Sequence, residues 1–298
     1  MKILLLGKNG QVGWELQRSL APLGEVIALD STSQDYCANF TDLSGLADTV
    51  RQIKPNIIVN AAAYTAVDKA ESEKELAQTI NADAVAVLAQ ETKLLNAWLV
   101  HYSTDYVFAG DGTVAWQETD VTGPLSVYGA TKFAGEQAIQ ASGCNHLIFR
   151  TSWVYGARGN NFAKTMLRLA KERDSLTVIN DQIGAPTGAD LLADVTAHAI
   201  RTAQLSPELS GLYHLVAAGE TSWHGYASFV IDYAQKMGQN LNTVVEAISP
   251  VPTSAFPTPA KRPNNSRLNT SKLQTNFALT LPKWQSGVAR MLTEFLEK

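Results

Sequence analysis

The sequence has 298 residues, of which 45% are hydrophobic and 17% are charged, so it is long and apolar enough to bury a full core. Its 24 Lys and Arg residues against 28 Asp and Glu residues give a formal net charge of −4. This balance excludes the basic surface that nucleic acid or an anionic membrane requires, and no apolar run approaches the roughly 18 residues of a membrane span. We therefore expect a small soluble partner, with no nucleic acid and no membrane.

The two cysteines, Cys37 and Cys144, lie far apart and belong to no CxxC or Cys/His cluster. This pattern favours free thiols in a reducing compartment over a zinc site or a disulfide framework. The first apolar run, residues 3–6, is shorter than the core of about 7–15 residues in a signal peptide. We therefore expect a cytoplasmic protein.

The first half of the chain alternates short aliphatic runs with longer stretches of helical spacing. Such alternation predicts parallel βαβ units with helices on both faces of one sheet, a Rossmann-like doubly wound α/β fold over residues 1–150. The expected strands are residues 2–6, 26–29, 56–59, 98–102 and 146–149, and the expected helices are residues 11–20, 43–53, 75–95 and 127–141.

The second half, residues 151–298, alternates less regularly and predicts a smaller, mainly substrate-binding C-terminal lobe, with an approximate boundary and some segments returning to the first domain. Residues 250–265 carry five prolines, which predicts a stiff loop rather than a helix or a central strand. The expected strands are residues 176–179, 212–216 and 244–248, and the expected helices are residues 190–202, 225–237 and 284–296.

A glycine turn joins the first strand to the first helix, with Gly7, Gly10 and Gly13 in a GxxGxxG spacing. A dinucleotide pyrophosphate can sit on the N–H groups of such a helix N-terminus when no side chain blocks its approach. We therefore predict a dinucleotide site that includes Gln11 and Val12. The alternative is a turn that only packs the helix on the sheet.

Asp30 ends the second strand, 23 residues after Gly7, where a carboxylate can accept hydrogen bonds from the adenosine ribose. Residues 19–50 contain no Lys or Arg that could bind a 2′-phosphate, so the pattern favours NADH. Lys8 in the glycine turn leaves NADPH open. The alternative for Asp30 is a solvated turn residue.

Tyr128 and Lys132 form a YxxxK pattern on a predicted helix, which places both side chains on one face. An adjacent ammonium is expected to lower the tyrosine pKa from about 10 by roughly 1–3 units, which makes it a usable proton donor. Thr104 follows a predicted strand at the edge where ligands bind in such folds. We predict that Thr104 and Tyr128 hold the same substrate oxygen; the alternative is a coincidental pairing of helix and strand-end residues.

These residues resemble the extended short-chain dehydrogenase/reductase superfamily, with its glycine turn, Ser/Thr and YxxxK. Over nearly the whole chain, further segments resemble the dTDP-4-dehydrorhamnose reductase family. They are NAAAYTAVD (60–68), STDYVF (103–108), RTSWVYG (150–156), NF (161–162), DQIGAPT (181–187) and RPNNSRL (262–268).

The resemblance implies reduction of the C4 ketone of dTDP-4-dehydro-6-deoxy-L-mannose to dTDP-L-rhamnose, a donor for bacterial surface polysaccharide such as lipopolysaccharide O-antigen. It implies Tyr128 as general acid, Lys132 as its partner and ribose anchor, and Thr104 as the polarising hydroxyl. Asp105 and Trp153 would line the sugar pocket. Residues that would flank the cofactor are Asn39, Phe40, Ala62, Ala63, Tyr64, Thr65 and Tyr102. Asn39 departs from the aspartate that many superfamily members have there.

Tyr106 follows Asp105, whereas related dehydratases place Asp-Glu after the catalytic threonine. Without that second carboxylate, simple hydride transfer is the expected reaction rather than dehydration. Arg262, with Lys261 and Arg267, is a candidate clamp for the substrate diphosphate, since guanidinium matches phosphate oxygens. The alternative is a set of solvated loop cations.

Similar reductases are often described as Mg²⁺-supported homodimers, so the resemblance implies a divalent ion with ligands that the sequence does not identify. Acidic residues on predicted helices that could meet across an interface are Glu15, Asp190, Asp194 and Glu294. The five histidines are dispersed without metal spacing, and we expect them to be structural. Two other functions stay open: another nucleotide-sugar reductase or epimerase, and a non-catalytic dinucleotide-binding regulatory subunit, as in relatives that serve methionine adenosyltransferase.

Overall fold

The computed structural model describes residues 1–297, and its core is one fully parallel six-stranded sheet. The strand order is β10-β5-β4-β3-β1-β2, so the direction of chain progression reverses between β1 and β3. All carboxyl ends meet at one edge, which confirms the predicted doubly wound fold. The strands are β1 (Lys2–Leu6), β2 (Glu25–Leu29), β3 (Ile57–Asn60), β4 (Trp98–Thr104), β5 (Asn145–Thr151) and β10 (Gly211–His214).

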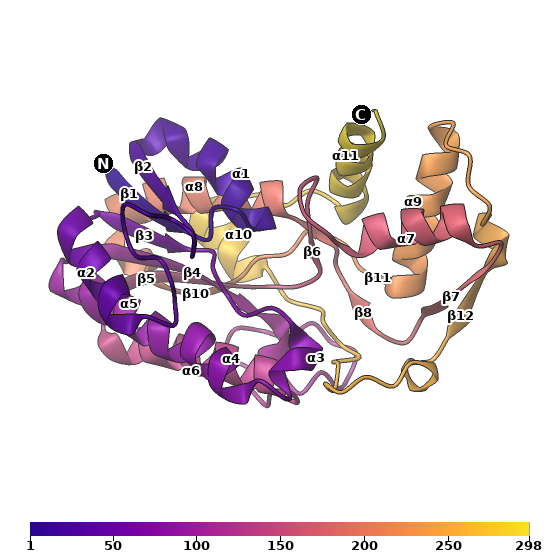
Figure 1. The fold of residues 1–298 in the computed structure, drawn as a ribbon. Coiled ribbons are helices and arrows are strands. Elements are labelled where there is room, and N and C mark those ends of the chain that lie inside the picture. Colours follow the sequence, from indigo (N-terminus) through magenta and orange to yellow (C-terminus); the bar gives the residue numbers. More distant parts are fainter. Residues whose placement is uncertain (298) are drawn as a thin grey trace.

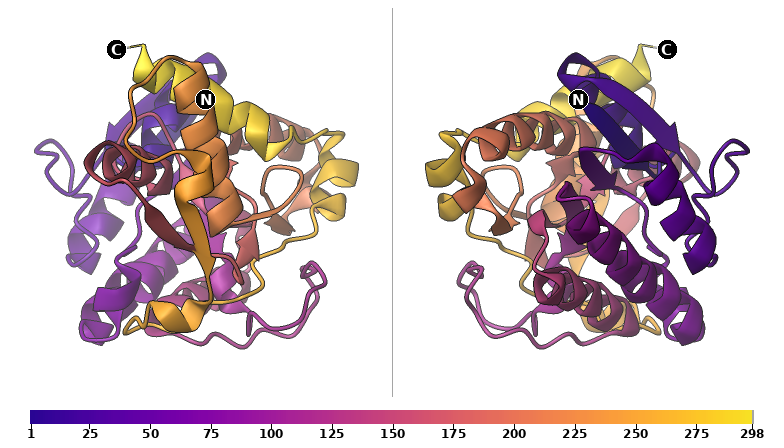
Figure 2. Two further views of the ribbon diagram at one scale, coloured as in Figure 1. Left: turned by 90° about the vertical axis from the view of Figure 1, so that its right-hand side faces the viewer. Right: turned by 90° about the vertical axis from the view of Figure 1, so that its left-hand side faces the viewer.

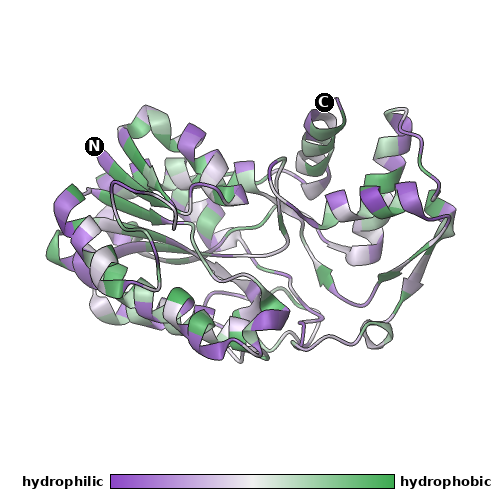
Figure 3. Cartoon of the chain, in the orientation of Figure 1, coloured by the Kyte–Doolittle hydropathy of each residue, from purple (hydrophilic) through white to green (hydrophobic). Residues whose placement is uncertain are grey.

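Alternate residues of the buried strands face different helix layers. Ile3 and Leu5 of β1 pack with one set of helices, whereas Leu4 and Leu6 pack with another. Figure 3 shows the apolar residues gathered on these strands. One face is covered by α1 (Gln11–Leu20), α8 (Ala189–Leu205) and α10 (Ser271–Phe277), and the other by α2 (Leu43–Ile53), α5 (Ala84–Leu94) and α6 (Val127–Ser142) (Figure 1).

A second apolar cluster lies beside the sheet and is built mainly from chain beyond residue 150 (Figure 2, left). It packs β7 (Leu176–Ile179) and β12 (Ile248–Val251) with α7 (Phe162–Glu172), α9 (Trp223–Lys236) and α11 (Trp284–Leu296). Short pairs, β6 (Val154–Tyr155) with β9 (Thr187–Gly188) and β8 (Ile183–Gly184) with β11 (Thr221–Ser222), lie between the second cluster and the sheet.

Several elements differ from the sequence-based expectation. The stretch 75–95 is split into α4 (Lys74–Gln78), a π turn (Thr79–Asp83) and α5, preceded by α3 (Val67–Ala70). Helix α7 was not predicted, although Asn161 caps it by accepting a hydrogen bond from the N–H of Lys164. The strand expected at residues 212–216 is β10, which ends at His214 and pairs with β5 of the central sheet.

The strand expected at 244–248 begins only at Ile248, and 245–247 form a 3₁₀ turn. Pro250 lies inside β12, so the expectation of a loop was wrong there. The β7–β12 sheet has only two strands, so both are edge strands. A proline is tolerated in an edge strand because the N–H that it lacks can be one that faces away from the partner strand. In the part of the chain described, the helices are all too short or too polar to cross a membrane.

Candidate active site

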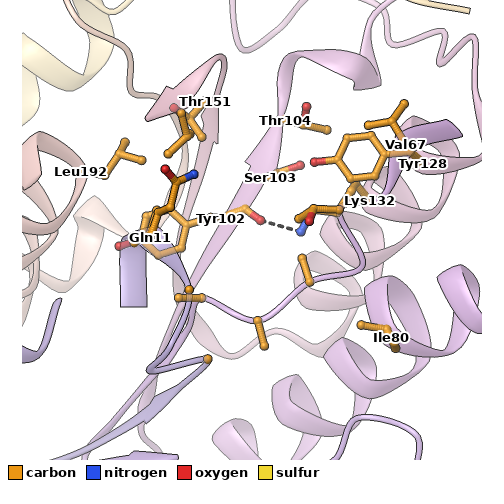
Figure 4. Close-up of a pocket in the computed structure, with 18 of the residues that line it drawn as sticks. Gln11, Val67, Ile80, Tyr102, Ser103, Thr104, Tyr128, Lys132, Thr151 and Leu192 are labelled. Atoms are coloured by element: carbon orange, nitrogen blue, oxygen red, sulfur yellow. Dashed lines mark hydrogen bonds between the residues drawn. The ribbon is translucent and has the colours of Figure 1, made fainter. Parts of the chain in front are cut away.

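A cavity of about 810 Å³ opens at the carboxyl edge of the sheet, within the size range of ligand pockets (Figure 4). It is bounded by the glycine turn, the segments after β2, β3, β4 and β5, helix α6 and part of the second apolar cluster. The structure brings together most of the predicted site residues here: Gly7, Gly10, Gln11, Val12, Asp30, Asn39, Phe40, Ala62, Ala63, Thr65, Tyr102, Thr104, Asp105, Tyr128, Lys132, Trp153 and Arg262.

The glycine turn leaves the start of α1 open to a ligand. Gly10 is the N-cap of α1, and no side chain caps the first N–H groups. Gly7 has φ +88°, a left-handed conformation that glycine adopts without strain. Gly13 does not line the cavity; a Cβ there would lie 2.0 Å from the carbonyl oxygen of Gly7.

A Gly13→Ala variant is expected to displace the glycine turn, since the clash is with backbone. The expected cost is about 1–3 kcal/mol of stability, with weaker dinucleotide binding. Urea unfolding and dinucleotide titration would measure both. Gly123→Ala is the matched control, because Gly123, like Gly13, has no positive φ and its Cβ would come no closer than 3.6 Å to its nearest neighbour, the Cβ of Ala109. Loss of dinucleotide binding in the control alone would contradict the argument.

The second strand ends in a polar cluster around Asp30. Its carboxylate accepts hydrogen bonds from the N–H and hydroxyl of Thr32 at 2.9 and 2.8 Å and from the Asn9 amide. The bond from the Thr32 hydroxyl, helped by the charge of Lys8, lowers the pKa of Asp30. Lys8 itself donates to the hydroxyl of Ser33 at 3.3 Å. A carboxylate and an ammonium therefore lie together where the adenosine ribose is expected.

The cofactor-side residues after β2 and β3 differ in their surroundings. The Asn39 side-chain oxygen accepts from the N–H and the hydroxyl of Thr41, so it is occupied within its own turn. Phe40 is buried beside it. Tyr64, unlike Ala62, Ala63 and Thr65, does not line the cavity; its hydroxyl bonds Glu73 and its N–H donates to Asn81.

Thr104, Tyr128 and Lys132 converge on one side of the cavity (Figure 4). Thr104 is the last residue of β4, and its oxygen accepts from the N–H of Tyr106 at 3.2 Å. Ser126 caps α6 by accepting from the N–H of Gly129. A Cβ at Gly129 would lie 2.2 Å from the carbonyl oxygen of Tyr106, so glycine lets α6 approach the strand end.

The expected effect of Lys132 on Tyr128 was wrong. Desolvation raises the pKa of Tyr128 to about 12, and a hydrogen bond with Thr104 opposes this only in part. Lys132 turns toward β4, where its Nζ donates to the carbonyl oxygen of Tyr102 at 2.6 Å (Figure 4). The same Nζ lies 3.2 Å from Nε2 of His101. Burial lowers the pKa of Lys132 to about 8.

Asp105 and Trp153 also line the cavity. Asp105 is 2% exposed, its Oδ1 accepts from the Thr104 hydroxyl at 3.1 Å, and its Oδ2 has no hydrogen-bond partner. Burial raises the pKa of Asp105 to about 6. Trp153 has φ +51° and stacks on Trp223, with ring centroids 3.6 Å apart. Backbone strain at a cavity wall is typical of functional positions.

The three cations of the proline-rich segment have different environments. Arg262 lines the cavity, forms a 2.8 Å ion pair with Asp68 of α3, and leaves its buried Nε without a partner. Arg267 instead pairs with Glu220, and Lys261 is exposed. Arg262 is therefore the cation that the structure brings to the candidate site.

Sequence reasoning missed several lining residues that come from distant segments. Tyr106 packs edge-on against Tyr128, with ring centroids 5.5 Å apart, and its position after Asp105 was the available signal. Trp223 begins α9, and no local pattern connects it to Trp153. Ser103 and Thr151 also line the cavity from the ends of β4 and β5.

The acidic residues considered as metal ligands are partly neutralised. Burial raises the pKa of Glu15, and the charges of Asp190 and Glu294 add to that effect. Asp190 pairs with Arg290, and Asp194 pairs with Arg18. Within residues 1–297, no group of three or more His, Cys, Asp or Glu side chains is arranged to hold a metal ion. The donor set of one chain therefore does not fit magnesium.

Comparison with known proteins agrees with this architecture. Residues 1–297 match the family model described as RmlD substrate binding domain. The chain is 64% identical to the dTDP-4-dehydrorhamnose reductase of Salmonella typhimurium over 294 residues, covering 99% of this chain and 98% of that protein. Two solved structures of dTDP-4-dehydrorhamnose reductases are also similar.

The structure from Clostridium acetobutylicum has 35% identity and a TM-score of 0.89, with 100% of both chains covered. That from Bacillus anthracis, in complex with NADP, has 37% identity and a TM-score of 0.87, covering 98% of this chain and 99% of that one. These matches confirm the resemblance inferred from the motifs. The chain therefore belongs to the dTDP-4-dehydrorhamnose reductases, a family of oxidoreductases.

Proposed function

We propose that this protein reduces the C4 ketone of dTDP-4-dehydro-6-deoxy-L-mannose to dTDP-L-rhamnose, with NADH or NADPH as the reductant. The observation that carries this proposal is one cavity that joins an open helix N-terminus at the glycine turn to Thr104 and Tyr128. A dinucleotide diphosphate at the first and a carbonyl oxygen at the second would occupy opposite ends of the same site.

When bound, the reduced nicotinamide supplies a hydride to C4 of the sugar. The Tyr128 hydroxyl gives its proton to the carbonyl oxygen, so that the ketone becomes an alcohol. The Thr104 hydroxyl, once it turns its single hydrogen from Asp105 Oδ1 to the substrate, donates a hydrogen bond to the same oxygen and stabilises the charge that develops on it. Because the pKa of Tyr128 is raised to about 12, the residue holds its proton at neutral pH, as a general acid must.

Two partnerless polar atoms support the substrate assignment. Asp105 Oδ2 is a buried acceptor that fits a sugar hydroxyl, and Arg262 Nε is a buried donor that fits a phosphate oxygen. Trp153, stacked on Trp223, presents an aromatic surface that fits the sugar ring. The Asp30 carboxylate would accept from the ribose of NADH, and nearby Lys8 would face the 2′-phosphate of NADPH.

We base the proposed assignment of the two domains on the two apolar clusters. We assign residues 1–150 to dinucleotide binding, together with the returning elements α8, β10 and α10, and most of residues 151–298 to the substrate lobe. A homodimer belongs to the proposal, and sedimentation at several protein concentrations tests it. We derive no step through magnesium; its role is tested by adding a chelator during turnover.

The experiment that tests the function is the loss of reduced nicotinamide when enzymatically generated dTDP-4-dehydro-L-rhamnose is added, with NADH and NADPH offered separately. Turnover with dTDP-L-rhamnose as the product supports the proposal. Dinucleotide binding without turnover would favour the regulatory subunit, and turnover only with another nucleotide sugar would favour a different reductase or an epimerase.

An Arg262→Ala variant is expected to raise the KM for the dTDP-sugar by about tenfold or more, since a charged hydrogen bond contributes about 1.5–3 kcal/mol. The dinucleotide Kd should change little. Arg267→Ala is the matched control, because Arg267 pairs with Glu220 and does not line the cavity. Equal effects of the two substitutions on KM would remove Arg262 from the substrate site.

A further inference from the structure

Lys132 is the end of a row of buried polar side chains behind the cavity. His101 of β4 and Asn60 at the end of β3 are each 1% exposed, and Lys132 is 2% exposed. Lys132 Nζ lies 3.2 Å from His101 Nε2, and His101 Nδ1 lies 3.1 Å from the Asn60 amide nitrogen. The positions of the protons in this row follow from the donors and acceptors at its far end.

The Asn60 amide is oriented by the backbone of the cofactor-side loop. The N–H of Ala62 donates to Asn60 Oδ1 at 3.0 Å, and a backbone N–H can only donate. The oxygen must therefore face Ala62, which leaves the NH₂ group facing His101. Because an amide NH₂ is also only a donor, His101 Nδ1 must be an acceptor without a proton.

A histidine with an unprotonated Nδ1 is neutral and carries its single proton on Nε2. In this chain that N–H points at Lys132 Nζ. An ammonium has three donors and no lone pair, so the contact is a hydrogen bond only when Lys132 is a neutral amine. The amine can still donate one of its own hydrogens to the carbonyl oxygen of Tyr102.

We propose that Asn60 fixes His101 as the Nε2–H tautomer and that this tautomer holds Lys132 as a neutral amine at neutral pH in the cofactor-free protein. Asn60 and His101 are then positioning residues for a group that faces the reaction site. Of the two residues in the cavity, only Tyr128 then holds its titratable proton, and Lys132 is an uncharged –NH₂ group.

The charges around Lys132 permit this state. On α6 the titratable neighbours are Tyr128 and Glu136, and the charge of Glu136 raises the pKa of Lys132. That carboxylate is already bonded to Arg150 of β5, with a shortest distance of 2.6 Å. Across the cavity, Asp105 bonds Thr104. Burial lowers the pKa of Lys132 to about 8 in spite of the opposing charge of Glu136, and the facing Nε2–H favours the amine further.

One consequence rests on the proposed function. If Lys132 stays neutral when the cofactor is bound, it has no ammonium proton to pass to Tyr128 after Tyr128 has protonated the substrate, so that proton must enter from solvent before the next turnover. The tautomer and the charge of Lys132 can be measured without any turnover, so a failure of this inference is distinguishable from a failure of the proposed reaction.

The test is NMR on the full-length, cofactor-free protein with ¹⁵N-labelled histidine and labelled lysine side chains. His101→Gln and Lys132→Gln spectra assign the two signals. We expect an Nε2–H imidazole for His101 and a titration midpoint for Lys132 below about pH 7. An Nδ1–H tautomer or an imidazolium, or a Lys132 midpoint above this value, overturns the proposal.

Asn60→Asp supplies a carboxylate that accepts from both the N–H of Ala62 and His101 Nδ1, so Nδ1 is expected to become protonated. Asn81→Asp is the matched control, since Asn81 is equally buried but bonds Tyr64 and Thr131 instead of a histidine. An unchanged tautomer in Asn60→Asp, or the same change in Asn81→Asp, overturns the role of Asn60. If Asn60→Asp does not fold, the measurements on the unaltered chain decide.

Discussion

Replacing Tyr128 with Phe is expected to lower kcat by about 10²–10⁴, the range that a positioned general acid contributes. The substitution removes one hydroxyl from the cavity and leaves the ring in place between α6 and Tyr106. Dinucleotide binding and the urea midpoint should therefore stay close to those of the parent protein. Single-turnover loss of reduced nicotinamide, measured on the enzyme loaded with cofactor, separates this chemical effect from binding.

Tyr106→Phe is the matched control for that experiment. Its ring lies 5.5 Å from that of Tyr128 at 80°, so both variants remove a phenol from the same wall of the cavity. We expect less than about a tenfold fall in kcat for Tyr106→Phe, because Tyr106 has no assigned proton transfer. An equal fall in kcat in the two variants would show that removal of either phenol from this side of the cavity slows the reaction. That result would contradict the role of Tyr128 as the specific proton donor.

The elements that sequence analysis placed well are those whose signals are local. Helices α1, α2 and α11 begin and end where their apolar spacing predicted, and β1 ends at the glycine turn. The glycine turn follows β1 and Thr104 ends β4, and parallel strands bring their carboxyl ends to one edge; Tyr128 joins them from α6. Local motifs and a simple topology were therefore enough to assemble the candidate site.

Contacts between distant segments could not be predicted from spacing. Asp68 reaches Arg262 across 194 residues, and the stack of Trp153 on Trp223 joins the segment between β5 and β6 to the start of α9. His101 was expected to be merely structural, because a lone histidine in a strand shows nothing of what it faces. Its contacts with Asn60 and Lys132 depend on the neighbouring strand and on the helix that packs over β4.

The Tyr128 pKa shows why a shared helix face is a weak electrostatic argument. The i,i+4 spacing does place Tyr128 and Lys132 on one side of α6. A lysine side chain is long and flexible, however, and here the Tyr102 carbonyl oxygen and His101 bind its end. Desolvation then dominates the Tyr128 pKa, a property of the assembled cavity rather than of the helix.

Asp105→Asn is expected to stabilise the fold while it weakens substrate binding. Burial raises the native pKa of Asp105 from 3.8 to about 6, so the folded protein binds more protons than the unfolded chain between these values. Stability therefore falls as the pH rises through this window, and the cost is complete above it. A shift of this size corresponds to on the order of 2–3 kcal/mol, which a neutral amide removes.

The gain in the free energy of unfolding should appear at about pH 7.5 and fade at about pH 4, where Asp105 is largely protonated in the native protein. Urea unfolding of both proteins at the two pH values measures it, with Asp111→Asn at an exposed position of the next loop as the control. The KM for the dTDP-sugar should rise, because an amide NH₂ can replace the acceptor Oδ2 that now has no partner. A variant that is less stable at about pH 7.5, or equally stabilised at both pH values, would contradict the prediction. Either result would show that the buried charge of Asp105 does not lower the free energy of unfolding.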